Sequence, residues 1–142
     1  MVQIVSIPHN GTHFIEKLLR EHNIPISAVC HITESQMGDI RTYEDIIIPL
    51  RHPEDVAESW AKRKQVRDWD FMYNTLPTIP AHLFFLDDKQ AALEKLSRHV
   101  NKQLKTDWTP ENHIHAKASQ MITEDQINRA VVIYNRLKGV AQ

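Results

Sequence analysis

A glycine and a hydroxyl stand at the start of a predicted helix in the segment SIPHNGTHF, from Ser6 to Phe14. Exposed backbone N–H groups and the positive end of the helix dipole make such a position attractive to phosphate or sulfate. The segment is not a Walker A motif, because Gly11 is followed by Thr12 and His13 and not by lysine. A plain strand-to-helix turn capped by Asn10 or Thr12 explains the pattern about as well as an anion site does.

A second segment, IIIPLRHPEDVAESW, places Arg51 at the tip of a predicted strand and Ser59 about two turns into the helix that follows. Arg51 is interpreted as an anion ligand, the alternative being a surface ion pair with Asp55 or Glu54. The hydroxyl of Ser59 is either a ligand or bonded to a carbonyl one helical turn back. His31 ends the run AVCHI, where a general base and a hydrogen-bonded histidine at a strand end are both open.

These segments together resemble the sulfotransferases that use 3′-phosphoadenosine 5′-phosphosulfate (PAPS). The family's PxSGT loop binds the phosphosulfate, and its R-x-P-x-D-V-x-x-S segment supplies an arginine and a serine to the 3′-phosphate. Asn10 stands in place of the family's usual serine, and His9 stands where a lysine or arginine is common. The matching residues are Pro8, Gly11 and Thr12 in the loop and Arg51, Pro53, Asp55, Val56 and Ser59 in the second segment.

The resemblance implies transfer of a sulfuryl group from PAPS to an acceptor hydroxyl or amine on a small molecule or glycan, with 3′-phosphoadenosine 5′-phosphate (PAP) as product. It further implies that His31 removes the acceptor proton and that His9 stabilises charge, which makes both predicted catalytic residues. The predicted cofactor-binding residues are Pro8, His9, Asn10, Gly11, Thr12, His13, Arg51 and Ser59. A non-catalytic PAP-binding or regulatory module is the alternative, and a small P-loop kinase is a weaker one.

Strands separated by helical segments predict a three-layer α/β/α fold with a short parallel sheet of the P-loop nucleotide-binding type, in one domain spanning residues 1–142. Such sheets bind ligands beyond the carboxyl ends of their strands, which places the Pro8–Thr12 loop, His31 and Arg51 on one rim. The predicted strands are Val2–Ile7, Ser27–Ile32, Asp45–Leu50 and His82–Leu86.

Helical spacing of apolar residues predicts four helices between and after these strands. The first helix carries Phe14 to Leu19, and the second runs from Arg51–Pro53 to about Arg63. The third follows a cap at Asp87 or Asp88 and places four apolar residues on one face, Leu93, Leu96, Val100 and Leu104. The last follows a capping box formed by Thr123 and Gln126 and ends near Gly139. The segment Asp68–Pro80, with two prolines, is predicted to be an ordered loop or lid. Its Trp69, Phe71 and Tyr73 either stack on adenine or pack the loop onto the core.

The 142 residues carry 17 Lys and Arg against 18 Asp and Glu, so a net charge of -1 provides no global field for nucleic acid or anionic lipid. Cys30 is the single cysteine, and neither a signal peptide nor a membrane anchor is visible, so a cytoplasmic setting is expected. His113 and His115 form a weak metal signal, and no metal site is predicted. The basic run Lys62–Arg67 is interpreted either as a solvated helix end or as a source of positive potential near the predicted 3′-phosphate site. The family's late Arg-Lys-Gly nucleotide clamp is missing, and Lys117 is the residue that would do part of its work.

Overall fold

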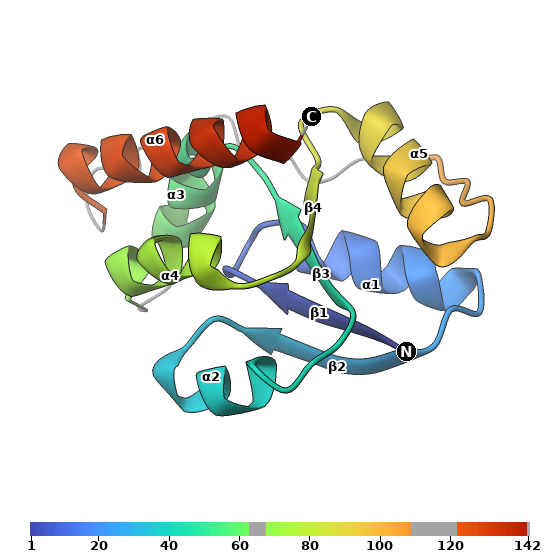
Figure 1. The fold of residues 1–142 in the computed structure, drawn as a ribbon. Helices are drawn as coiled ribbons and strands as arrows, with labels where there is room; N and C mark the ends of the chain where they lie inside the picture. The colour runs from blue at the N-terminus through green and yellow to red at the C-terminus, as the bar shows by residue number, and fades with distance from the viewer. Residues whose placement is uncertain (63–67, 109–121, 142) are drawn as a thin grey trace.

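A computed structural model describes residues 1–62, 68–108 and 122–141 and shows a parallel sheet at the centre of the molecule (Figure 1). Its four strands lie in the order β2-β1-β3-β4. Their bounds are β1 Val2–Ser6, β2 Ile26–His31, β3 Ile46–Leu50 and β4 His82–Phe85. Each of the four predicted strands is confirmed to within a residue at either end.

Helices cover both faces of the sheet, so the predicted three-layer α/β/α arrangement agrees with the structure. One face packs against α1 (Thr12–Glu21) and α5 (Lys89–Val100). The other packs against α2 (Glu34–Ile40), α3 (Pro53–Lys62), α4 (Trp69–Thr75) and α6 (Glu124–Ala141). Every residue of β3 is buried, as continuous apolar character predicts for a strand covered on both faces.

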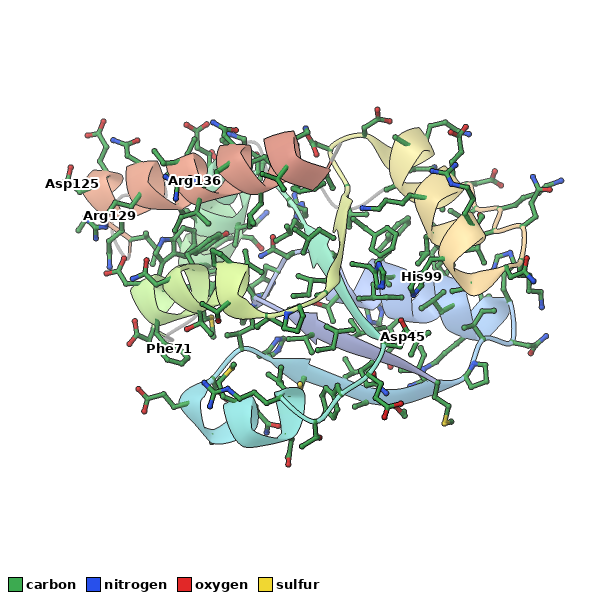
Figure 2. The ribbon with its side chains drawn as sticks, in the orientation of Figure 1. Asp45, Phe71, His99, Asp125, Arg129 and Arg136 are labelled. Carbon is green, nitrogen blue, oxygen red and sulfur yellow. The ribbon has the colours of Figure 1, made fainter. Side chains whose placement is uncertain are left out.

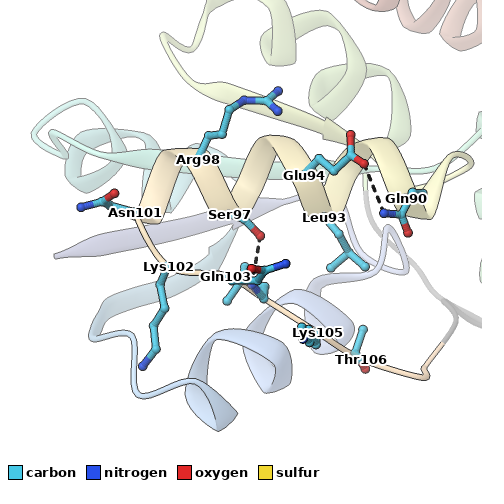
Figure 3. Close-up of a pocket in the computed structure, with 11 residues that line it drawn as sticks. Gln90, Leu93, Glu94, Ser97, Arg98, Asn101, Lys102, Gln103, Lys105 and Thr106 are labelled. Carbon is cyan, nitrogen blue, oxygen red and sulfur yellow. Dashed lines mark hydrogen bonds between the residues drawn. The ribbon is translucent and has the colours of Figure 1, made fainter.

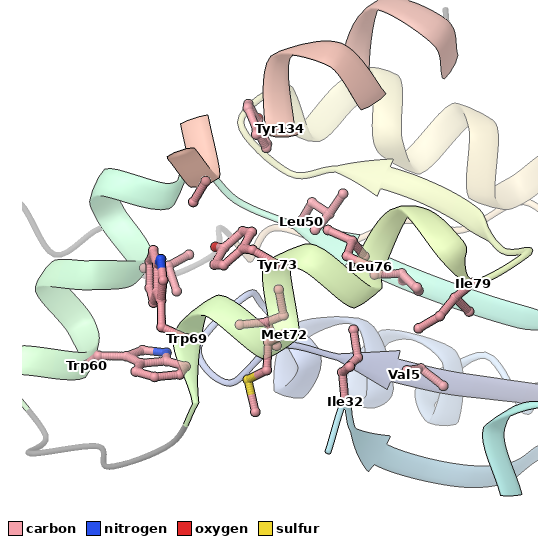
Figure 4. Close-up of a cluster of buried hydrophobic side chains, with 14 of the residues drawn as sticks. Val5, Ile32, Leu50, Trp60, Trp69, Met72, Tyr73, Leu76, Ile79 and Tyr134 are labelled. Atoms are coloured by element: carbon pink, nitrogen blue, oxygen red, sulfur yellow. The ribbon is translucent and has the colours of Figure 1, made fainter. Parts of the chain in front are cut away.

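Aromatic side chains from three helices form the centre of the larger core (Figure 4). The Trp60 ring of α3 packs edge-on against the Trp69 ring of α4, with 5.2 Å between the ring centroids. Tyr73 lies one helical turn beyond Trp69, with 4.6 Å between their centroids. Trp69 also donates its indole N–H to the Gln126 carbonyl of α6, so the packing joins α3, α4 and α6.

The prediction of a loop or lid over Asp68–Pro80 is wrong, because α4 and a 3-10 turn (Leu76–Thr78) occupy this segment. The Asp68 carboxylate caps α4 by accepting from the Phe71 N–H at 3.0 Å. The prolines follow α4, where they do not interrupt it. Trp69 and Tyr73 are each 2% exposed, so both belong to the core and neither is placed to stack on a nucleotide base.

Two further predictions about helices need correction. The short helix α2 was not predicted, since its only buried side chains are Met37 and Ile40 and no extended stripe marks it. Leu104 is not part of α5, which ends at Val100 with Asn101 in the left-handed region at φ 54°. Leu104 still packs into the same core cluster as Leu93 and Leu96.

Other helix boundaries were predicted correctly. Asp88 is the residue that caps α5, accepting from the Ala91 N–H. The capping box before α6 is present, with Thr123 and Gln126 exchanging hydrogen bonds. Among the helices of the described residues, none combines the length and the apolar character that a membrane span requires.

Candidate functional site

The carboxyl ends of β1 and β3 lie side by side at the point where the chain changes direction across the sheet. The crossover after β1 leads to β2 on one side, and the next crossover leads back past β1 to β3 on the other. Ligands of doubly wound sheets bind at such switch points. The loop before α1 follows β1 here, and Arg51 follows β3, so the structure brings together two segments that the sequence separates.

The helix α1 begins without a side-chain cap. Gly11 occupies the N-cap position at φ 82°, and neither a side-chain cap nor an acidic residue is found in the first turn. The first intrahelical bond runs from the Ile15 N–H to the Gly11 carbonyl at 3.1 Å. Capping by Asn10 or Thr12, the alternative explanation of the sequence pattern, is therefore not what the structure shows.

The Asn10 side chain is fully buried and holds the loop to the end of β3. Its Nδ2 donates to the Ile7 carbonyl at 3.1 Å, and its Oδ1 accepts from the Arg51 backbone N–H at 2.9 Å. Burial raises the pKa of the nearby Tyr73, a rise that Asn10 partly opposes, so the phenol stays neutral. Asn10 thus has a positioning function inside the loop and does not point to an external ligand.

The carbonyl groups of the loop are also held from outside. The indole N–H of Trp60 donates to the Pro8 carbonyl at 2.7 Å. The Arg51 guanidinium donates to the His9 carbonyl at 3.3 Å, and Arg51 is only 8% exposed. His9 adopts a left-handed conformation, φ 67°, which non-glycine residues occupy rarely. With its carbonyls held in this way, the loop is preorganised before any ligand arrives.

A chain of side chains connects the loop with the predicted base. The Thr12 hydroxyl donates to Ser6 Oγ at 2.6 Å, and Ser6 Oγ lies 3.2 Å from His31 Nδ1. When both neighbours donate to Ser6 Oγ, a neutral His31 carries its proton on Nδ1. Sequence reasoning missed Ser6, although its position at the end of β1, directly before the loop, could have indicated it.

Ser59 and His13 occupy contrasting environments. Ser59 lies next to Trp60 on α3 and is fully buried, and its Oγ has no hydrogen-bond partner among the described residues. His13 is exposed on the first turn of α1. Both remain predicted ligands by position, Ser59 on the helix that contacts the loop and His13 next to the helix start.

A pocket beside α5 lies away from the candidate site. It is lined by α5 and the residues after it, including Ser97, Lys102 and Thr106, and none of the predicted site residues contributes to it (Figure 3). Predictions about His113, His115, Lys117 and residues 63–67 fall outside the described part of the chain.

Comparison with family models, with curated proteins and with solved structures found no match for this chain. The functional interpretation is therefore carried by the geometry of the loop, Arg51 and His31.

Proposed function

We propose that the chain is a sulfotransferase-like enzyme of the P-loop nucleotide-binding type, which transfers a sulfuryl group from PAPS to an acceptor hydroxyl or amine. The observation that carries the proposal is the uncapped start of α1 at the switch point of the sheet, directly beside Arg51. A helix N-terminus without a side-chain cap or acidic neighbour suits a dianionic ligand.

In this proposal the phosphosulfate lies on the first-turn N–H groups after Gly11, the N-cap residue that offers no side chain to occupy them. The guanidinium of Arg51, which also holds the His9 carbonyl, faces the 3′-phosphate. The unpartnered hydroxyl of Ser59 would gain a partner from the same phosphate. His9 and His13 add positive charge when protonated.

The transfer step places the acceptor oxygen or nitrogen in line with the sulfur. Its lone pair forms the new bond to sulfur while the bond from sulfur to the bridging phosphate oxygen breaks, and PAP leaves with that electron pair. The acceptor proton passes to His31 Nε2. Hydrogen-bond donors preorganised at the start of α1 stabilise the charge that develops on the leaving phosphate.

One observation favours the alternative of a binding module. Arg51 is largely buried and bonded to the loop itself, so part of its function is structural whether or not catalysis occurs. A kinase is less well supported, because Gly11 is followed by Thr12 and the loop lacks the lysine that phosphoryl transfer requires.

A thermal-shift comparison of PAP, adenosine 5′-phosphosulfate and Mg-ATP tests the proposal. PAP should stabilise the fold without magnesium, by about 2.7 kcal/mol at a hundred times its Kd. Arg51→Ala should weaken PAP by about 1.5–3 kcal/mol and adenosine 5′-phosphosulfate much less, since the latter lacks the 3′-phosphate. Comparing two ligands on one variant removes any effect of Arg51 on folding, and the exposed Arg41→Ala serves as the matched control.

The outcomes separate the candidate functions. Protection by Mg-ATP and not by PAP would favour the kinase. Protection by PAP without sulfation of any member of a broad alcohol, amine and glycan panel would favour the binding module. Equal losses of both ligands in Arg51→Ala would remove Arg51 from the 3′-phosphate site.

A further inference from the structure

Two histidines and an aspartate meet at the edge of the sheet opposite the candidate nucleotide loop. Asp45 directly precedes β3, and His82 is the first residue of β4. The two strands are parallel, with Ile47 aligned with His82, so their amino-terminal ends share this edge. His99 comes from the last turn of α5, which packs over the same strands.

The three side chains are close together. The distance from His99 Nε2 to Asp45 Oδ1 is 2.7 Å, and Figure 2 shows these two side chains facing each other between α5 and the sheet. The His82 and His99 rings lie with 4.2 Å between their centroids. One nitrogen or oxygen from each residue lies within 4.8 Å of the others.

This donor set and spacing suit a first-row transition metal. Imidazole nitrogens and a carboxylate oxygen bind Zn²⁺ at roughly 2.0–2.2 Å, which places tetrahedral ligands about 3.3 Å apart. One separation in the cluster is 2.7 Å and all of them are within 4.8 Å, so side-chain rotations would bring the three atoms to that spacing. The neighbouring Lys95 ammonium is held by the Leu83 carbonyl at 2.7 Å.

We propose that Asp45, His82 and His99 form a divalent transition-metal site, with Zn²⁺ as the expected occupant. The three ligands leave the fourth tetrahedral position to a solvent ligand. In the metal-bound form His99 would carry its proton on Nδ1, so that the Nε2 lone pair binds the metal in place of the Nε2–H that faces Asp45. Because the ligands come from β3, β4 and α5, the ion ties three elements together at an edge remote from the nucleotide loop.

The HIH motif of His113 and His115 is a second potential source of zinc binding, so the experiment must distinguish the two. Chelator-treated full-length protein is titrated with Zn²⁺ by calorimetry, with circular dichroism and melting temperature recorded for every variant. The wild type should bind one equivalent with a saturating rise in melting temperature. The double variant His113→Ala/His115→Ala should retain both the one equivalent of bound Zn²⁺ and the rise in melting temperature, so it is the matched control.

Loss of a ligand should cost at least about 100-fold in Zn²⁺ affinity, since even residues that only support a ligand are typically worth 10–100-fold. His82→Ala is the decisive variant, because His82 is exposed at the start of its strand and its removal should leave the fold intact. His99→Gln and Asp45→Asn should show losses in the same direction. Co²⁺ should give visible d–d absorption in the wild type and not in His82→Ala.

Three results would overturn the site: a wild type that binds no Zn²⁺, His82→Ala with unchanged affinity, or a double HIH variant that loses the binding. PAP affinity is measured alongside, with and without Zn²⁺. It should not depend on the metal, so failure of the nucleotide proposal leaves the metal site standing.

Discussion

Gly11 is constrained twice, by its backbone and by its neighbour. Its φ of 82° is unfavourable for any residue with a Cβ, and a Cβ built there would lie 2.3 Å from Leu86 Cδ1. Gly11→Ala should therefore lower the free energy of unfolding by at least about 1–2 kcal/mol. It should also weaken PAP binding, because the new methyl group alters the loop that is proposed to hold the phosphosulfate.

Gly38→Ala is the matched control for this prediction. Gly38 lies within α2, and a Cβ there meets nothing within 4 Å. The substitution should be neutral or should stabilise by about 0.5–1 kcal/mol through helix propensity. Urea denaturation measures both variants, and a Gly11→Ala protein as stable as the wild type would contradict the strain argument.

His31 is the residue that separates an enzyme from a binding module. His31→Ala should leave PAP affinity within a few-fold while lowering turnover at least about 100-fold, the usual scale of general-base assistance. Ser6→Ala should lower turnover as well and change its pH profile, since Ser6 positions the His31 ring through Nδ1. In His9→Ala, by contrast, PAP affinity and turnover should fall together.

Steady-state kinetics with an acceptor found in the panel, together with calorimetric titration of PAP, measures these changes. Turnover unchanged in His31→Ala would exclude it as the base. An unchanged pH profile in Ser6→Ala would assign Ser6 a purely structural function.

At the scale of elements, α6 is attached to the rest of the molecule at both ends. Near its start, Arg129 pairs with Asp70 of α4 at 3.2 Å. Farther along, Tyr134 donates to Asp87 Oδ1 at 2.8 Å, and Lys138 pairs with the other oxygen of the same carboxylate. Asp87 lies between β4 and α5, so this contact connects α6 to the rim that carries the candidate site (Figure 1).

This attachment should depend on pH. Burial disfavours the charged form of Asp87, but hydrogen bonds from Lys138 and Tyr134 outweigh it and hold the pKa of Asp87 below its ordinary value of 3.8. A folded-state pKa below the unfolded one adds stability at neutral pH, which is lost as pH falls below 3.8 and through the folded-state pKa. Asp87→Asn should lower the free energy of unfolding by about 1 kcal/mol at pH 7, because it removes hydrogen bonds to a charged group whose strength is reduced by solvent screening.

The difference between wild type and Asp87→Asn should shrink as the solution is acidified below pH 3.8 and should be constant at neutral pH. Urea denaturation across this range measures it. Asp107→Asn, at an exposed position after α5, serves as the control and should show little change. A difference that grows on acidification would have the wrong sign for this attachment.

At the scale of the whole molecule, the α/β class and all four strands were predictable because each strand is a short run with apolar residues, separated from the next by a helical pattern or by turn residues. The rim carrying the loop, His31 and Arg51 followed from the rule that parallel strands place their carboxyl ends together. Asp68–Pro80 was not predicted correctly, because two prolines outweighed the Asp68 cap and the buried spacing of Trp69, Met72 and Tyr73.

Contacts that depend on tertiary structure could not be predicted from local pattern. Trp60 lies within a predicted helix, but its indole hydrogen bond to the Pro8 carbonyl depends on how α3 packs against the loop. Asp45, His82 and His99 lie far apart in the chain, and no metal-binding spacing marks them. Their proximity arises only when β3, β4 and α5 are in place, so no local pattern in the sequence singles out these three residues together.

The parallel sheet also governs how the chain can fold. Every strand pair of the described sheet is parallel, and Gln3 of β1 pairs with Ala28 on one side and with Ile46 on the other. Among the described strands no two are joined as a hairpin that could nucleate the sheet, and distant segments must meet first, which slows folding. Ile4 and Val5 of β1 cannot be fully covered until β3, Ile46–Leu50, is available to pair with β1, so a partly folded chain exposes this apolar strand to chaperones or to aggregation.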